Sequence, residues 1–190
     1  MFYLQINIFT LKYLCAIDVF ETGQDWKIAA LRTSIYVHFL FEVHMNVKYL
    51  NLALENAKTA FDMGEVPVGA VIVRNNTIIS SAYNLKENRN CSIFHAEILA
   101  IIEASKKLGN WRLSDCDMYV SLDPCPMCAS AIKQSRISNV YSAYSHSLNN
   151  SNIIKSIFSD IDNNSIVNFE TNLSPIYSKF LLDNFFSNKR

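Results

Sequence analysis

Apolar positions recur with different periods along the chain, and each period predicts a type of secondary structure. Leu50, Leu54 and Phe61 recur at helical spacing through 46–63, and Gly64 follows as a stop signal. This segment therefore predicts an amphipathic helix that ends just before Gly64.

A β-hairpin is predicted next. Residues 68–73 are a short run rich in β-branched side chains, and 77–83 can form its partner strand. Asn75 and Asn76 lie between the two runs, and asparagine suits a tight turn because it tolerates left-handed backbone angles.

Helices and strands then alternate. A helix is expected over 92–108, with Ile98, Ile101 and Ile102 facing inward and Gly109 as its C-cap. The remaining predicted elements are strands over 117–122, 139–144 and 166–169, and helices over 126–134, 153–158 and 175–187. This order predicts an α/β layered sandwich with helices on both faces of a sheet.

Residues 1–44 differ in kind from the rest of the chain. They are rich in aromatic side chains but show no clean helical or strand period, and polar residues interrupt their most apolar stretch, 1–20. A membrane span needs about 20 predominantly apolar residues, and a secretory signal needs a basic start and a small-residue cleavage site. We find neither. We expect 1–44 to be an extension that arises from an upstream start codon and lies outside a folded domain of residues 45–190.

Composition narrows the class of protein. The 190 residues are 50% hydrophobic and 18% charged, with a formal net charge of zero and only four Gly and four Pro. These values exclude a mainly disordered or collagen-like chain. From residue 45 onward, 14 Lys and Arg stand against 13 Asp and Glu, a net charge of +1. Bulk electrostatic attraction to nucleic acid or to an anionic membrane is therefore disfavoured, which leaves a local basic patch open.

The cysteines point to a metal or redox site. There are five, at positions 15, 91, 116, 125 and 128, and an odd number at irregular spacing is a poor disulfide framework. Cys125 and Cys128 form a Cys-x-x-Cys pair, which in a reducing compartment indicates metal binding or redox chemistry. We therefore expect the protein in the cytoplasm.

Two short motifs carry the candidate chemistry, His95-Ala-Glu97 and Pro124-Cys-Pro-Met-Cys128. Each lies near the expected start of a helix, where free N–H groups and the helix dipole favour thiolates. Cys125 and Cys128 share one face of their helix, and a histidine nitrogen supplies a third ligand. Three protein ligands with an open fourth position are typical of catalytic zinc, whereas structural zinc sites have four. Glu97 is then the candidate general acid and base.

Together the two motifs match the zinc-dependent deaminase signature H-x-E…P-C-x-x-C. The wider sequence resembles the bacterial tRNA-specific adenosine deaminases of the cytidine and deoxycytidylate deaminase superfamily. The stretches that carry this resemblance are Gly64-Glu-Val-Pro-Val-Gly-Ala-Val-Ile-Val73, Asn110-Trp-Arg-Leu113 and Leu122-Asp-Pro-Cys-Pro-Met-Cys-Ala129. The resemblance covers residues 47–144 well and the rest of the chain thinly.

The resemblance implies a three-layer α/β/α sandwich of the cytidine-deaminase type, with a central mixed sheet of about five strands, working as a homodimer. It implies one zinc ion per subunit, held by His95, Cys125 and Cys128, and hydrolytic deamination of adenosine to inosine at wobble position 34 of a tRNA. By the same resemblance, Asn84 and the backbone N–H of Ala96 contact the flipped base. Phe186 belongs to an aromatic pair that resembles one near the anticodon stem-loop in this family.

Three departures from the family pattern leave alternatives open. Asp123 stands where glutamate is usual, Cys91-Ser-Ile-Phe94 replaces Asp-Pro-Thr-Ala, and 143–150 is rich in Ser and Asn where the family is rich in Gly. The first alternative is a deaminase of the same fold that acts on a free base or nucleoside such as guanine or cytosine. The second is a catalytically silent, zinc-bearing RNA-binding module. For Asn84 the plainer interpretation is a turn residue, and for Phe186 it is core packing.

Overall fold

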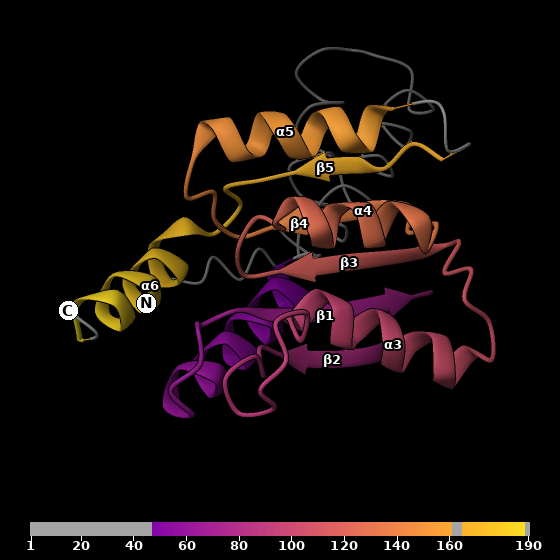
Figure 1. Ribbon diagram of the computed structural model, residues 1–190. Helices are drawn as coiled ribbons and strands as arrows, with labels where there is room; N and C mark the ends of the chain where they lie inside the picture. Colours follow the sequence, from indigo (N-terminus) through magenta and orange to yellow (C-terminus); the bar gives the residue numbers. More distant parts are fainter. Residues whose placement is uncertain (1–46, 161–164, 189–190) are drawn as a thin grey trace, which may run out of the picture. The chain divides into compact units, whose positions relative to one another are not determined.

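The computed structural model describes residues 47–160 and 165–188, so the predicted extension over 1–44 lies outside the described residues. The described strands form one five-stranded sheet in the order β2-β1-β3-β4-β5 (Figure 1). The strands are β1 (Gly69–Arg74), β2 (Thr77–Tyr83), β3 (Cys116–Val120), β4 (Asn139–Ser142) and β5 (Asn168–Glu170). β1 pairs antiparallel with β2 and β3, whereas β3, β4 and β5 are parallel. The predicted mixed sheet of about five strands is therefore confirmed.

Helices cover both faces of this sheet (Figure 1). Figure 1 labels the helices α3 (Ala96–Leu108), α4 (Pro126–Gln134), α5 (Leu148–Ser159) and α6 (Pro175–Asn188). α3, α4 and α5 lie on one face, and the helix over 47–62 lies on the other. α6 lies near the end of β3, where the Ser178 hydroxyl donates to the Ser121 carbonyl at 2.5 Å. The arrangement confirms the three-layer α/β/α sandwich. Within the described ranges we find no helix with the length and apolar character that a membrane span requires.

The tight packing of the helix over 47–62 depends on Gly69, the first residue of β1. A Cβ atom at Gly69 would lie 2.2 Å from the Ala53 carbonyl oxygen and 2.7 Å from the Ala57 nitrogen. Real Cβ atoms do not approach backbone atoms this closely, so a side chain here would force the helix away from the sheet. Ala53 and Ala57 are themselves fully buried, which continues the same close contact along the helix.

The hairpin is confirmed, and its turn has the expected chemistry. Asn75 and Asn76 have φ angles of 49° and 58°, the left-handed values that a two-residue type I′ turn requires. Gly109 is likewise confirmed as the C-cap of α3, with a φ of 63°.

The sequence prediction was wrong about the start of α3 and only partly right about its inward face, where Ile101 packs against the core as expected but Ile102 does not. The helix begins at Ala96 rather than at 92, and it buries Ala96, Ala100 and Ala104, while Ile102 is 41% exposed. Small side chains let the helix lie close to the sheet, and the Ser80 hydroxyl on β2 donates to the Ala100 carbonyl. Hydrophobicity alone predicts that the isoleucines face the sheet. The helix lies so close to the sheet that only alanines fit at the most buried positions.

The prediction also placed the start of α5 too late. The segment over 148–152 was expected to be loop because it is rich in Asn and Ser, yet α5 runs from 148 to 159. Contacts from other elements override this local preference. The Ser151 hydroxyl donates to Asp123, and the Lys133 ammonium group binds carbonyls at the other end of the helix.

Candidate active site

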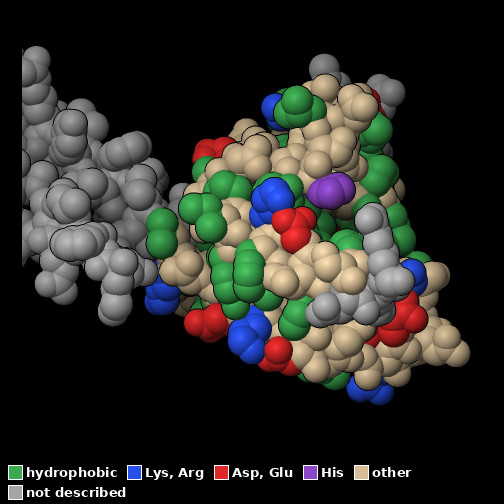
Figure 2. Space-filling view, turned by 90° about the vertical axis from the view of Figure 1, so that its left-hand side faces the viewer, with side chains coloured by type: hydrophobic (Ala, Val, Ile, Leu, Met, Phe, Trp, Pro, Cys, Tyr) green, Lys and Arg blue, Asp and Glu red, His purple; other side chains and the backbone are tan. Residues whose placement is uncertain are grey.

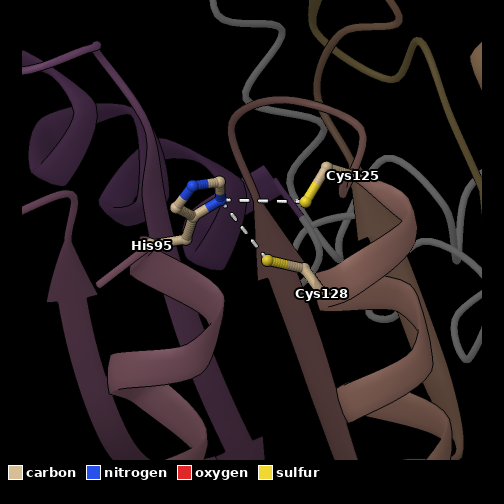
Figure 3. A group of neighbouring side chains, drawn as sticks. All are labelled: His95, Cys125 and Cys128. Atoms are coloured by element: carbon tan, nitrogen blue, oxygen red, sulfur yellow. Dashed lines mark hydrogen bonds between the residues drawn. The ribbon is translucent and has the colours of Figure 1, made fainter. Parts of the chain in front are cut away.

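Two helix starts bring the candidate metal ligands together. His95 is the last extended residue before α3, with φ −76° and ψ 154°, and Cys125 is in the same position before α4, with φ −75° and ψ 166°. Because β2 and β3 run in the same direction, the segments that follow them leave the same edge of the sheet. Cys128 lies one turn into α4 and is fully buried. Figure 3 shows the three side chains pointing toward one another.

The distances between these ligand atoms fit a tetrahedral metal ion. His95 Nδ1 lies 3.8 Å from Cys125 Sγ and 3.6 Å from Cys128 Sγ, and the three atoms all lie within 4.8 Å of one another. Zinc bonds of about 2.1 Å to nitrogen and about 2.3 Å to sulfur, at tetrahedral angles, separate such ligand atoms by about 3.6–3.8 Å. Two thiolates and an imidazole are also the donor types that zinc prefers. The predicted ligands therefore converge with a geometry and chemistry that fit zinc.

The pKa values of the two cysteine thiols are shifted in opposite directions. Hydrogen bonds from Cys128 and from His95 lower the pKa of Cys125 to about 4. The hydrogen bond to Cys125 and burial together raise the pKa of Cys128, and the Cys125 thiolate raises the pKa of His95. Metal binding at this cluster must therefore displace the Cys128 proton, since only thiolates ligate zinc.

Glu97 lies in the first turn of α3 and is 3% exposed. Burial raises its pKa to about 7, and the neighbouring Cys125 adds to this effect. Its Oε2 atom is buried and has no hydrogen-bond partner among the described residues. A carboxyl group that titrates near neutrality and has an uncommitted oxygen beside a metal cluster can both accept and return a proton.

A cavity of about 700 Å³ opens beside Cys125. Its walls come from four segments of the chain, and the lining includes Asp123, His146, Asn150, Leu182 and Phe186. Among the described residues that line the cavity, none is Lys or Arg. Figure 2 shows this end of the molecule, where basic and acidic side chains are mixed with hydrophobic ones and neither sign dominates. The cavity therefore suits a neutral, partly apolar group better than a phosphate.

Of the three residues predicted to contact the substrate, Phe186 lines the cavity, whereas Ala96 and Asn84 do not. Phe186 is 50% exposed and lines the cavity, so its side chain is not core packing. Ala96 is fully buried as the first residue of α3. Asn84 follows β2, is 4% exposed, and is not among the residues that line the cavity. Its amide Nδ2 group instead lies 3.4 Å from Glu65 Oε2.

Sequence reasoning missed the side chains that hold the cavity wall. The Asp123 carboxylate accepts hydrogen bonds of 2.6 Å from the Ser151 hydroxyl on α5 and from the Thr171 hydroxyl after β5. The Ser151 hydroxyl in turn lies 2.6 Å from that of Ser145. The departure of Asp123 from the family pattern was the available signal, but its partners are 28 and 48 residues away in sequence and cannot be paired without the fold.

Lys133 is a second residue that the sequence did not identify. Its side chain is 3% exposed on α4, and its ammonium group donates to the carbonyls of Ile157 and Asp160 at the end of α5. The Asp160 carboxylate lies 3.6 Å away. A cation at a helix C-terminus satisfies carbonyls that have no partner within the helix. α5 is therefore tied to the metal-binding segment at both of its ends.

The comparison with known families agrees with this geometry. Residues 44–144 match the cytidine and deoxycytidylate deaminase zinc-binding region, and the chain belongs to this deaminase family. Similar proteins include tRNA-specific adenosine deaminases. That of Bacillus subtilis (strain 168) is 52% identical over 92 residues, which are 48% of this chain and 57% of that protein. That of Buchnera aphidicola subsp. Schizaphis graminum (strain Sg) is 36% identical over 143 residues, 75% of this chain and 94% of that protein.

The match to the Bacillus enzyme thus spans little more than half of that protein's length. A solved structure from work on A-to-I editing by tRNA:A34 deaminases has a TM-score of 0.66 and 31% identity to this chain. The superposition covers 72% of this chain and 99% of the other. The resemblance and the cytidine-deaminase type of fold that the sequence predicted are therefore both confirmed.

Proposed function

We propose that the protein is a zinc-dependent enzyme that converts adenosine to inosine at wobble position 34 of a tRNA and releases ammonia. The observation that carries this proposal is the buried Glu97 carboxyl, with one uncommitted oxygen, beside three converging metal ligands. A structural zinc site has no use for such a group, which argues against a silent module. The tRNA substrate follows from the relatives, whose names assign them that activity.

His95, Cys125 and Cys128 hold one zinc ion per subunit in this proposal. When bound, zinc supplies a Lewis acid that brings the pKa of water toward neutrality. The backbone at the starts of α3 and α4 holds the three ligands in place before the metal binds. This preorganisation reduces the rearrangement that metal binding requires.

Glu97 moves the protons of the reaction. It accepts a proton from the attacking water and passes it to the purine ring as the new C–O bond forms at C6. It then takes the proton of the new C6 hydroxyl and delivers it to the departing amino group, so that the C–N bond breaks, ammonia leaves and a carbonyl remains. The raised pKa of Glu97, about 7, suits both transfers because the group gains and loses a proton with little cost near neutrality.

The anticodon stem-loop supplies the substrate base from outside. We assign Phe186, at the cavity wall, to stacking against this loop, and Asn84 and the Ala96 N–H to holding the flipped base. A cavity whose described lining carries Asp123 and Asp183 but no Lys or Arg supports entry of a base rather than of its phosphate. We place the reaction in the cytoplasm, since the four cysteines in the described part of the chain are all free.

A homodimer completes the proposal. Several large apolar side chains are exposed on the described surface, among them Leu148 at 80%, Ile176 at 86% and Phe180 at 59%. Exposed apolar side chains of this size are typical of surfaces that bind another protein, and a second copy of the chain is the proposed partner.

The test is inosine formation by the full chain, with its zinc content measured. We expect inosine at position 34 of a tRNA that carries an unmodified adenosine there, and its loss in Glu97→Ala with zinc retained. Glu103→Ala, an exposed acid on the same helix, is the matched control and keeps activity. No inosine from zinc-loaded protein would contradict the proposal. Ammonia release from guanine or cytosine would then indicate a free-base deaminase, and no release would indicate a silent module.

A further inference from the structure

A buried carboxylate outside the metal cluster is fixed by the end of a helix. Gly64 ends the helix over 47–62 with a φ of +76°. Its N–H donates to the Phe61 carbonyl at 3.0 Å, and the Glu65 N–H donates to the Ala60 carbonyl at 2.9 Å. This pair of bonds is the Schellman motif, which sets the direction of the chain beyond the helix. The Glu65 side chain is thereby directed into the protein, where it is 0% exposed.

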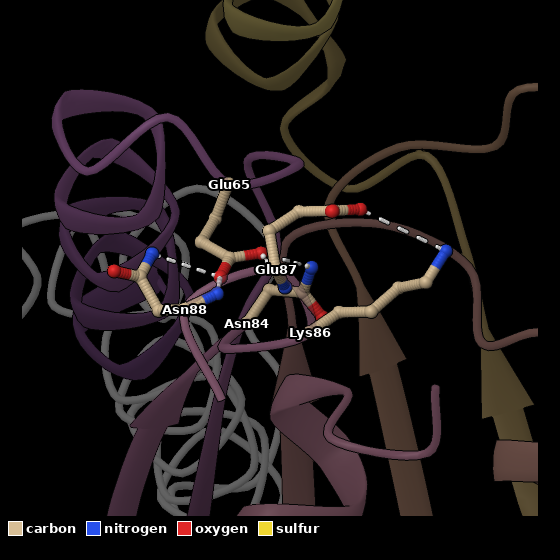
Figure 4. Close-up of polar contacts among 5 residues, drawn as sticks. All are labelled: Glu65, Asn84, Lys86, Glu87 and Asn88. Atoms are coloured by element: carbon tan, nitrogen blue, oxygen red, sulfur yellow. Dashed lines mark hydrogen bonds and ion pairs between the residues drawn. The ribbon is translucent and has the colours of Figure 1, made fainter. Parts of the chain in front are cut away.

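Four hydrogen bonds reach the Glu65 carboxylate from the loop that connects β2 to α3 (Figure 4). The backbone N–H groups of Glu87 and Asn88 donate at 3.2 and 2.7 Å, and the Asn88 side-chain amide donates at 3.0 Å. The Asn84 amide donates at 3.4 Å. A buried carboxylate is costly unless donors surround it, so these four bonds and the order of the loop depend on each other.

The same loop delivers a metal ligand. The Leu85 N–H donates to the Phe94 carbonyl at 3.0 Å, which closes the loop at its base. Asn84 and His95 are the neighbours of these two residues, so the hydrogen bond sets them side by side. Asn84 is also fixed from the other side, because its backbone N–H donates to the Val68 carbonyl at 3.0 Å.

The orientation of the Asn84 amide follows from the chemistry of its partner. An ionised carboxylate only accepts hydrogen bonds, so the NH₂ group of Asn84 must face Glu65. The carbonyl oxygen of Asn84 then faces away from Glu65, as Figure 4 shows. Without Glu65 the amide could turn over, because its two ends have nearly the same shape.

We propose that Glu65 is a positioning residue for deamination, which acts by fixing the Asn84 amide and the loop beside His95. The inference rests on the proposed function for the role of Asn84 toward the base. Glu65 acts on the substrate through Asn84. It keeps one end of the Asn84 amide occupied, so that a single orientation is presented to the substrate.

The first experiment exchanges the two partners. Glu65→Gln places an NH₂ group against the Asn84 NH₂, and Asn84→Asp places a second carboxylate against Glu65. Misplacement of about 1 Å near a reacting group costs up to about 100-fold, so we expect each variant to lose about 10- to 100-fold in kcat/KM on tRNA. The double variant restores a donor and an acceptor, and we expect it to recover at least about tenfold over the weaker single variant.

A merely structural role for Glu65 predicts a different result. The two losses would then multiply in the double variant, and that outcome would overturn the proposal. The matched control is Glu103→Gln, which makes the same chemical change at an exposed glutamate on α3, outside this network. We expect kcat/KM of this control to stay within about threefold of wild type. Zinc content and melting temperature are measured for every variant.

A second experiment does not depend on activity. In the ¹⁵N-labelled protein, the side-chain amide protons of Asn84 are assigned by their loss in Asn84→Ala. We expect them to be shifted from the positions of exposed Asn amides and to exchange slowly. Both properties should be lost in Glu65→Gln but kept in Glu103→Gln. Asn84 amide signals that already look free in wild type would overturn the inference even if no variant folds. Absence of inosine from the wild-type enzyme would instead count against the proposed function alone.

Discussion

The metal cluster and the outer wall of the cavity are held in place by different kinds of bond. His95 and Cys125 take their positions from the backbone, since each is the last extended residue before a helix at the same edge of the sheet. The outer wall, formed by the segment from 145 through α5 and by α6, depends on side chains. Asp123, Ser151 and Thr171 join it to the metal-binding segment.

We infer from this difference that the metal cluster determines the chemistry and that the cavity wall determines which substrate binds. Backbone geometry at strand ends and helix starts tolerates many neighbouring sequences, so a short motif suffices to specify the metal ligands. A wall joined by side-chain hydrogen bonds changes whenever one partner changes. The wall is also where the sequence departs from the family pattern, at Asp123 and over 143–150. We therefore expect perturbation of the cluster to abolish turnover, and perturbation of the wall to change substrate affinity.

The largest effect should come from the cluster. Cys128→Ala removes a buried ligand, and we expect the purified protein to contain less than a tenth of the wild-type zinc and no measurable deaminase activity. Cys91→Ala, at a partly exposed cysteine outside the cluster, is the control and should keep both. Metal analysis and inosine formation are the measurements. Full zinc occupancy in Cys128→Ala would mean that another residue completes the site.

The wall should respond to Asp123→Ala. The variant leaves the hydroxyls of Ser151 and Thr171 without their buried acceptor, and we expect a stability loss of about 2–3 kcal/mol. KM for tRNA should rise about tenfold or more while zinc content stays at the wild-type level. Asp115→Asn, an exposed residue far from the wall, serves as the control. Loss of zinc in Asp123→Ala would erase the distinction between cluster and wall.

The far end of the wall should respond to Lys133→Met. The substitution keeps a long side chain but removes the donor to the α5 carbonyls, and we expect about 2 kcal/mol of lost stability. Urea unfolding measures this loss. The control is Lys155→Met, on the exposed face of α5. Equal midpoints for the two variants would show that the end of α5 does not need the cation.

Salt should affect tRNA binding only weakly. The cavity has no Lys or Arg among the described residues that line it, and the described surface around it carries both signs of charge. If the loop makes one or two phosphate contacts, a rise from 50 to 200 mM salt weakens binding about three- to sevenfold. A nucleic-acid protein with many phosphate contacts weakens by about 10³-fold or more over the same range. Such a steep dependence would place a basic surface elsewhere on the chain.

The smallest effect should come from Asp117, which belongs to neither region. Burial raises its pKa, although a hydrogen bond from Asn139 opposes this shift. A raised pKa means that the folded state binds the proton more tightly, so the contribution to stability is full below the unfolded pKa of about 4 and is lost as pH rises. Asp117→Asn should therefore raise the free energy of unfolding by less than about 1 kcal/mol at pH 7 and leave it unchanged at pH 3, as measured by urea unfolding. Equal gains at both pH values would contradict this origin.

The sequence predicted best those features that local rules decide. β2 and α4 have the predicted bounds, and the three predicted ligands converge. The errors at Ile102 and at the start of α5 arose where packing distance and distant partners decide. The buried roles of Glu65 and Lys133 depend on donors and acceptors that lie 19 to 27 residues away. The roles of Glu97, Asn84, Ala96 and Phe186 toward substrate remain predictions that the experiments above address.

The contacts of Lys133 also limit where residues can be inserted into α5. Its ammonium group recognises particular carbonyls at the end of α5, while Ser151 near the start of that helix is bound to Asp123. An inserted residue turns the rest of a helix by about 100° and advances it by about 1.5 Å. One insertion between 151 and 157 would therefore turn the carbonyls away from Lys133 while Ser151 stayed in place. Relatives that differ in length here should carry their insertions before the helix or after it, and the spacing between its two anchors should be the part that evolution leaves alone.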